Sequence, residues 1–230
     1  SRTAWRFKID YSLPVNENVK FEAGYQSRIR EAGGNYTYDD WINNDWVQND
    51  TYTNKLLFIR DIHSLYSTIS GNILGIGYMA GIRGEYTSRL IEQITSGESF
   101  PVERFDFFPS VHFTKELQKS QQIQLSYSRR IERPRHWYLN PFPGYADAYS
   151  VRVGNPELLP EYVDSYELSY QKRMNQQFIN IAAYFRQKNN NINRIQELRD
   201  DGKLLMTFDN LDKEYSYGTE ISANLKIKKW

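Results

Sequence analysis

Apolar and polar side chains alternate along much of this chain, with the period of two that places successive side chains on opposite faces of a β-strand. Nine segments have strand-like sequence. Two of them, at about 53–70 and 103–116, alternate less regularly but have the composition of strands. The alternation is clearest at 75–89, where one face holds Ile76, Tyr78, Ala80, Ile82 and Tyr86 and the other holds Gly75, Gly77, Gly81, Arg83 and Glu85. The pattern predicts an all-β protein without helices.

The connections between these segments differ in length, and short and long ones take turns along the chain. Tight turns are expected at 12–18, 71–72, 117–121 and 173–176, and long polar connections at 27–51, 90–102, 131–161 and 188–203. A transmembrane β-barrel has short turns at one membrane face and long loops at the other. The alternation of lengths therefore favours a barrel wall of about nine antiparallel, meandering strands.

The two faces of the expected sheet differ in chemistry. The apolar face has Tyr, Phe and Trp near the ends of the segments and Ile, Leu and Ala between them, which is typical of a lipid-facing band with aromatic girdles. The polar face mixes Glu, Arg, Lys, Gln and Gly, as a wet lumen or a surface packed on a polar plug would. The alternative is a soluble antiparallel sheet with one face on a protein core and one in water. Periodicity alone does not separate the two, but the segment 75–89 exceeds the usual 3–10 residues of soluble strands.

Composition narrows the class of protein further. Of the 230 residues, 40% are hydrophobic, 15% are aromatic and none is Cys, and the formal net charge is +1. No run of about 18 apolar residues is present, so an ordinary transmembrane helix is not expected. Balanced charge gives no reason to expect nucleic acid as a partner. The chain opens in strand-like sequence without a signal peptide, which suggests a processed or truncated start.

No group of residues has the spacing of a catalytic or metal site. His63, His112 and His136 lie far apart, and the acidic residues form no recognisable acid–base pair. The glycines at 75–84 lie within a strand, where they allow bending or the close approach of a plug. We therefore expect no enzyme activity, no metal and no cofactor.

Aromatic residues gather in two of the long connections, among polar neighbours. Such rigid, amphipathic side chains are used by ligand-binding loops, although a loop that folds over a lumen and buries its own aromatics has the same composition. Both alternatives stay open. The candidate ligand-binding residues are Tyr36, Tyr38, Trp41 and Trp46 in the loop 35–50, and Trp137, Tyr138 and Tyr145 in the loop 133–155.

A basic cluster precedes the second of these loops. Arg129, Arg130, Arg133 and Arg135 lie within seven positions of one another. Such a cluster suits lipopolysaccharide phosphates or an acidic ligand, and it also suits a solvated rim, which is the commoner case.

A run of motifs from 108 to 170 resembles a known family. The motifs are FPS at 108–110, LSYSRRIERP at 125–134, LNPF at 139–142, GNPELLPEY at 154–162 and SYEL at 165–168, with GIRGEYT at 81–87 before them and YSYGTE at 215–220 after them. In this order they are similar to the barrel of TonB-dependent outer-membrane receptors, in the group called the outer membrane protein beta-barrel family. Pro156 and Pro160 withhold backbone donors, so they suit the end of a loop before strand pairing resumes.

The resemblance implies a place and a set of partners. Such receptors have about 22 strands around an N-terminal plug, so residues 1–230 are expected to be a fragment of the barrel domain, with the plug and the remaining strands absent. The implied location is the outer membrane. The implied partners are TonB, the receptor's own plug, outer-membrane lipid and a small-molecule, glycan or peptide ligand.

The function implied by the resemblance is energised uptake of a scarce nutrient, in which loops capture the ligand and TonB drives rearrangement of the plug. The alternative function is that of a soluble antiparallel β-sheet module that recognises carbohydrate or protein through its aromatic loops.

Overall fold

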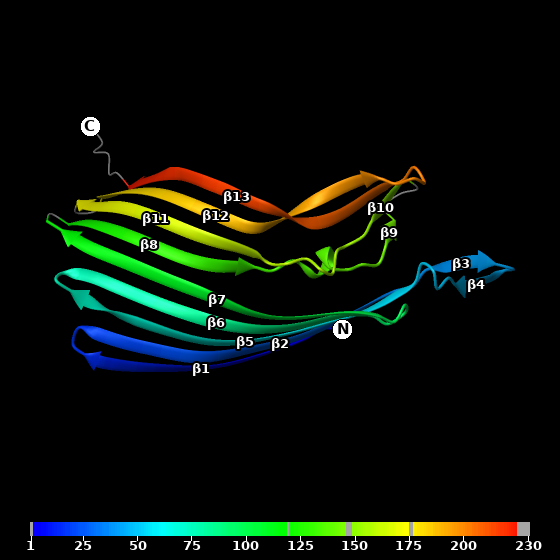
Figure 1. Cartoon of the computed structure of the whole chain (residues 1–230), viewed down its shortest axis with the longest axis horizontal. Coiled ribbons are helices and arrows are strands. Elements are labelled where there is room, and N and C mark those ends of the chain that lie inside the picture. Colours follow the sequence, from blue (N-terminus) through cyan, green and yellow to red (C-terminus); the bar gives the residue numbers. More distant parts are fainter. Residues whose placement is uncertain (1, 119, 146–148, 175–176, 225–230) are drawn as a thin grey trace, which may run out of the picture.

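The computed structural model is dominated by one large curved, open sheet whose long strands follow one another in chain order (Figure 1). It describes residues 2–118, 120–145, 149–174 and 177–224. Within these ranges no helix is long and apolar enough to cross a membrane. The long strands are β1 (Arg2–Asn16), β2 (Val19–Tyr36), β5 (Asn54–Ile73), β6 (Ile76–Gln93), β7 (Glu98–Leu117), β8 (Gln121–Glu132), β11 (Glu161–Met174), β12 (Gln177–Leu198) and β13 (Leu204–Asn224).

The smaller elements belong to the connections. Strands β3 (Asp39–Ile42) and β4 (Asp45–Gln48) form a hairpin of their own that projects beyond the sheet (Figure 1). The connection after β8 holds a short 3-10 helix, η1 (His136–Tyr138), and strands β9 (Gly144–Tyr145) and β10 (Ser150–Arg152). The nine long strands that the sequence predicts are thus all present, and this single 3-10 turn departs from the expectation of no helix in the part of the chain described.

All neighbouring long strands are antiparallel, and the sheet does not close on itself. The order runs from β1 to β13, and the short strands β10 and β9 extend it only beside Leu204–Met206, so β1 and the rest of β13 are the free edges of the long strands. Every residue of β1 is exposed. This open, meandering sheet confirms the predicted barrel wall.

Strand register sorts the side chains onto the two predicted faces. Ser64, Glu85 and Asp106 are directly opposite one another on β5, β6 and β7, and they share the polar face. One residue further along, Leu65 and Phe107 flank Gly84 on the apolar face, where both side chains are exposed. The alternation in the sequence therefore reports the two faces of the sheet correctly.

One expected turn lies three residues later than predicted. Gly71 and Asn72 still belong to β5, and the turn is formed by Leu74 and Gly75, with φ of 52° and 73°. Positive φ at both central residues is the geometry of the tight hairpin turn that matches strand twist. Gly75 therefore lies in this turn and not on the polar face of a strand, as the sequence suggested.

Two of the expected long connections are strand for most of their length. Strands β6 and β7 stay paired up to Gln93 and Glu98, so only 94–97 connect them, and β12 and β13 stay paired up to Leu198 and Leu204. Likewise β2 continues to Tyr36, well into the expected loop 27–51. In these stretches apolar and polar residues no longer alternate regularly, so the sequence resembles a loop.

The remaining connections have the predicted asymmetry. Those at 17–18 and 74–75, with residues 118 and 120, lie at one end of the sheet, and the long one at 37–53 and the described residues of 133–160 lie at the other (Figure 1). Residues 119 and 175–176, in two of the expected tight turns, lie outside the described residues.

The connection 133–160 folds back against the wall. Strands β7 and β8 pair only from Ser110 to Leu117, so their other ends separate. Leu139 and Leu158 from the connection are buried there, and with Phe58, Ile91 and Phe208 they form the main hydrophobic cluster. Strand β10 then pairs in parallel with the start of β13.

Gly154 and Asn155, in the motif GNPELLPEY, hold the connection 133–160 in this folded-back position. Gly154 N–H donates to the Asn140 carbonyl at 2.8 Å, and Asn155 N–H donates to the Tyr138 carbonyl at 2.7 Å. The Asn155 amide also donates to the Phe208 carbonyl at 3.2 Å, which ties the connection to β13. Strand pairing resumes at Glu161, directly after Pro160, as the two prolines predict.

We expect Gly154→Ala to destabilise the folded-back connection. A Cβ on Gly154 would lie 2.5 Å from the Asn140 oxygen and 2.6 Å from the Tyr138 oxygen, both backbone atoms. Overpacking of this kind costs about 1–3 kcal/mol. Faster proteolysis within 133–160 and a lower Tm would show it. Gly34→Ala is the control, because its Cβ would meet nothing within 4 Å, and equal behaviour of the two variants would contradict the role of Gly154.

We expect Ile181→Arg on the apolar face of β12 to cost roughly 2–4 kcal/mol if the site lies near the bilayer midplane, because the change places a charge against lipid. Ile181 is exposed and lies opposite Tyr170 and Ile221. Asn180→Arg, one position away on the polar face, should be mild. Denaturant titration of the protein folded into lipid vesicles measures both, and equal costs would argue against a lipid-facing wall.

Candidate ligand-binding site

A buried carboxylate, Glu85, is the centre of a charged network on the polar face. The Glu85 side chain is 3% exposed and contacts three guanidinium groups. Arg83 Nη2 lies 2.5 Å and Arg28 Nη2 lies 3.3 Å from Glu85 Oε1, while Arg133 Nη2 contacts Oε2. Ser64 Oγ also donates to Oε1, at 3.2 Å. One negative charge is thus shared among three positive charges, which leaves a local excess of positive charge.

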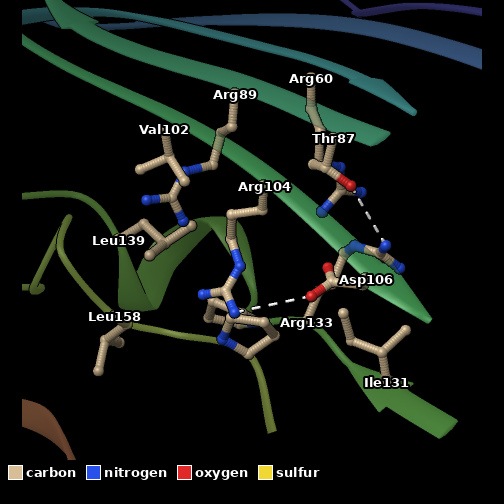
Figure 2. A pocket seen from close by; sticks show the side chains of 12 residues that line it. Arg60, Thr87, Arg89, Val102, Arg104, Asp106, Ile131, Arg133, Leu139 and Leu158 are labelled. Atoms are coloured by element: carbon tan, nitrogen blue, oxygen red, sulfur yellow. Dashed lines mark hydrogen bonds and ion pairs between the residues drawn. The ribbon is translucent and has the colours of Figure 1, made fainter. Parts of the chain in front are cut away.

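The strands bring these residues together from separate parts of the sequence. Arg83 and Glu85 are two apart on β6 and so point to the same face. Arg28 lies on β2, opposite Ile62 of β5. Arg133 directly follows β8 and also lies 3.4 Å from Thr87 Oγ1, across the region where β7 and β8 separate (Figure 2). The network therefore links three strands to the folded-back connection.

A second carboxylate, Asp106, is the cross-strand neighbour of Glu85 on β7. The hydroxyl of Tyr162, on β11, donates to Asp106 and accepts from Arg104 Nη2 at 2.5 Å. Arg104 itself is 3.7 Å from Asp106. Both carboxylates in this region are therefore already engaged by protein cations and hydroxyls.

Three further arginines lie in one row across the sheet. Arg30 is opposite Arg60, and Arg60 is opposite Arg89. Like charges directly opposite one another destabilise a sheet. Arg89 Nη2 donates to the Pro156 carbonyl at 2.6 Å, and Arg60 lies over the Phe58 ring at 5.6 Å. Neither Arg30 nor Arg60 has an acidic partner within ion-pair distance among the described residues.

A cavity of about 480 Å³ opens between this row and the start of the folded-back connection. Its lining includes Arg28, Arg30, Phe58, Arg60, Arg133 and Trp137. A smaller cavity of about 30 Å³ shares Arg60 and Arg133 and is bordered by Arg89, Arg104, Leu139 and Leu158. Figure 2 shows the arginine side chains of the smaller cavity approaching one another from β5, β6, β7 and the segment after β8.

The predicted aromatic residues of the loop 35–50 lie away from this cavity. Trp41 and Trp46 form a cross-strand pair in the β3–β4 hairpin, with ring centroids 5.1 Å apart and exposed fractions of 57% and 66%. Tyr38 packs against Tyr52 at 5.3 Å. Both tryptophan side chains are therefore exposed in this hairpin.

The aromatic residues of the second loop lie closer to the wall. Trp137 and Tyr138 pack on Phe208, with ring centroids 5.3 and 4.2 Å from it. The ring centroid of Tyr36, at the end of β2, lies 6.4 Å from that of Phe142, so the two loops meet at this point. The backbone of Tyr145 pairs with Val151 in the small β9–β10 ladder.

Comparison with known proteins assigns the chain to a family. The model of the outer membrane protein beta-barrel family matches residues 1–230. The chain belongs to this family. The assignment confirms the resemblance seen in the motifs, and it places the apolar face in the outer membrane rather than on a soluble core.

Solved structures share the fold of this barrel-family chain at low sequence identity. The copper transporter OprC has a TM-score of 0.72 and 12% identity, with 99% of this chain and 36% of OprC covered. The FrpB iron transporter from Neisseria meningitidis (F3-3 variant) has a TM-score of 0.67 and 11% identity, with coverage of 99% and 33%. A double mutant of the Serratia marcescens hemophore receptor HasR, in complex with HasA and heme, has a TM-score of 0.61 and 14% identity. The match covers 97% of this chain and 46% of HasR.

These likenesses show the fold, and the chain spans about a third to a half of the length of those structures. No curated protein sequence matches the chain. Among the residues that the structure describes, no three His, Cys, Asp or Glu side chains are grouped so that they could hold a metal ion.

Most of the arginine network is absent from the candidates chosen by sequence. Only Arg133 and Arg135 of the predicted basic cluster line the larger cavity, while Arg129 lies over the Tyr162 ring at 5.0 Å and Arg130 is exposed. The alternation places Arg83 and Glu85 on the polar face, which was the available signal. Their partners on β2 and beyond β8 depend on strand register, which the sequence does not supply.

We expect Glu85→Gln to destabilise the protein by roughly 3 kcal/mol, because removing the acid from a buried ion pair leaves the opposite charges uncompensated. Urea unfolding in detergent measures the change. Glu167→Gln is the matched control, since this exposed residue of β11 lies opposite Ser126 and Tyr184 with no charge beside it in the ladder. Similar midpoints for the two variants would contradict the central role of Glu85.

Proposed function

We propose that residues 1–230 are part of the barrel wall of a TonB-dependent receptor that takes up a scarce nutrient across the outer membrane. The observation that supports this most directly is the charged cavity on the polar face, which a folded-back loop borders on an outer-membrane wall. A purely structural barrel has no need for a cluster of incompletely paired arginines there. The structures with the same fold include a copper transporter, an iron transporter and a hemophore receptor.

The proposal includes partners supplied by the rest of the receptor. The free edges of the wall, β1 and the part of β13 after Met206, would need further strands beside them, because an unpaired strand edge in lipid is costly. A plug inside the completed barrel would then face the polar side of the sheet, and TonB would drive its rearrangement. The cell's outer-membrane lipid covers the apolar side.

We also propose that the two aromatic loops contact the ligand at different places. Trp41 and Trp46 are exposed on a hairpin that pairs only with itself, so they are suited to a first contact with ligand above the barrel. Tyr36 and Tyr38 stand at the base of that hairpin. Trp137, Tyr138 and Tyr145 belong to the connection beside the cavity, and Trp137 lines the cavity itself.

The test is uptake in cells that express the full-length receptor. We expect deletion of the receptor gene and deletion of the tonB gene to abolish uptake of the same nutrient from a panel supplied at growth-limiting concentration. Trp41→Ala with Trp46→Ala should weaken ligand binding about tenfold without lowering the Tm, because the hairpin lies outside the main sheet. Unchanged uptake of every nutrient in the receptor deletion would refute the proposed function.

A further inference from the structure

We propose that the cavity lined by Arg30, Arg60 and Trp137 binds a small polyanion, a molecule that has phosphate, sulfate or carboxylate groups at more than one position. This inference rests on the proposed function and names the ligand class of the same receptor. Three observations support it: the row of Arg30, Arg60 and Arg89, the shape of the cavity, and the ion pairs and hydrogen bonds that the nearby carboxylates already make.

The first argument is the charge of the polar face near the cavity. Among the described residues the carboxylates there are Glu85 and Asp106, and each already contacts protein groups. Negative charge from outside the wall is therefore needed to balance the remaining cations. The guanidinium groups that gather there belong to Arg28, Arg30, Arg60, Arg83, Arg89, Arg104 and Arg133.

The second argument is the number of unused donors. The buried Nε atoms of Arg28, Arg30, Arg83 and Arg89 have no hydrogen-bond partner among the described residues. Buried N–H groups without acceptors are costly, and guanidinium groups form their strongest hydrogen bonds with oxyanions, often two at a time. An oxyanion in the cavity would supply acceptors to Arg30 and Arg60, which have no acid within ion-pair distance among the described residues.

The third argument is shape. The cavity measures about 480 Å³, within the range of small-molecule sites. A second hollow of about 480 Å³ shares Arg28, Arg30 and Arg60 with it and continues to Arg2 and Arg6 on β1. The two together make an elongated cationic track, which fits a ligand with several anionic groups better than a single ion.

One wall of the cavity is apolar and aromatic. Trp137 is 36% exposed, and Phe58 lies beneath Arg60. A ligand with a flat or apolar part could stack on Trp137 while its anionic groups meet the arginines. Lipopolysaccharide is a poorer match, because its phosphates lie beside the lipid-facing side and the arginine row lies on the opposite face.

The test measures binding of inorganic tripolyphosphate and of citrate to the full-length receptor in detergent, by calorimetry, at two ionic strengths. We expect both to bind, and to bind more weakly in high salt. Arg60→Gln and Arg30→Gln should each weaken binding about tenfold, and Arg60→Lys should weaken it less. Both Gln variants should fold, since each removes one of several mutually repelling charges.

Arg186→Gln is the matched control. Arg186 also lies over an aromatic ring, that of Tyr184 at 4.6 Å, but it is on β12, away from the cavity. An equal loss of binding in this control would show general charge attraction and overturn the site. Absence of binding by the wild-type receptor would overturn it too. Binding that appears only after the plug is deleted would assign the arginines to an acidic plug segment instead.

The outcomes also separate this inference from the proposed function. TonB-dependent uptake of a nutrient by a receptor that binds neither anion would refute the polyanion site and leave the uptake function standing. Anion binding by a receptor whose deletion affects no uptake would refute the uptake function and leave the polyanion site standing.

Discussion

The contact between Glu85 and three arginines is the interaction on which the cavity and the position of the connection 133–160 depend. The carboxylate is almost fully buried, and its partners come from β2, β6 and the segment after β8. Charges removed from water are stable only when they are paired and hydrogen-bonded. Because one acid serves three cations, the same contact that attaches the connection 133–160 to the wall also leaves the cavity positively charged.

The folded-back connection and the separation of β7 from β8 are parts of one arrangement. Where the ladder between these strands stops after Ser110, backbone groups and apolar side chains lose their neighbours. Leu139 and Leu158 fill that space, and the motif around Gly154 and Asn155 holds the backbone that presents them. The cavity exists because this connection lies against the wall. The β3–β4 hairpin, by contrast, extends away from the sheet (Figure 1).

Much of the wall could be predicted from the sequence, because the period of two and the turn residues are local properties. The apolar face, the nine long strands and the asymmetry of the connections all follow from neighbouring residues. The ends of the strands could not be predicted, since β6, β7, β12 and β13 continue where the regular alternation of apolar and polar residues is lost. The aromatic loops were found by composition, but the arginine row was not, because no two of Arg30, Arg60 and Arg89 are close in sequence.

The sequence by itself determined the fold class, the family and the side of the sheet on which each residue lies, since all three depend on short-range patterns and motifs. Only the tertiary structure decided which residues of that side meet. Register between strands is set by the sum of many cross-strand contacts, and a shift of one residue would move Glu85 to the apolar face. The candidate site is therefore a property of register and of one loop's path, and both depend on contacts between residues far apart in the chain.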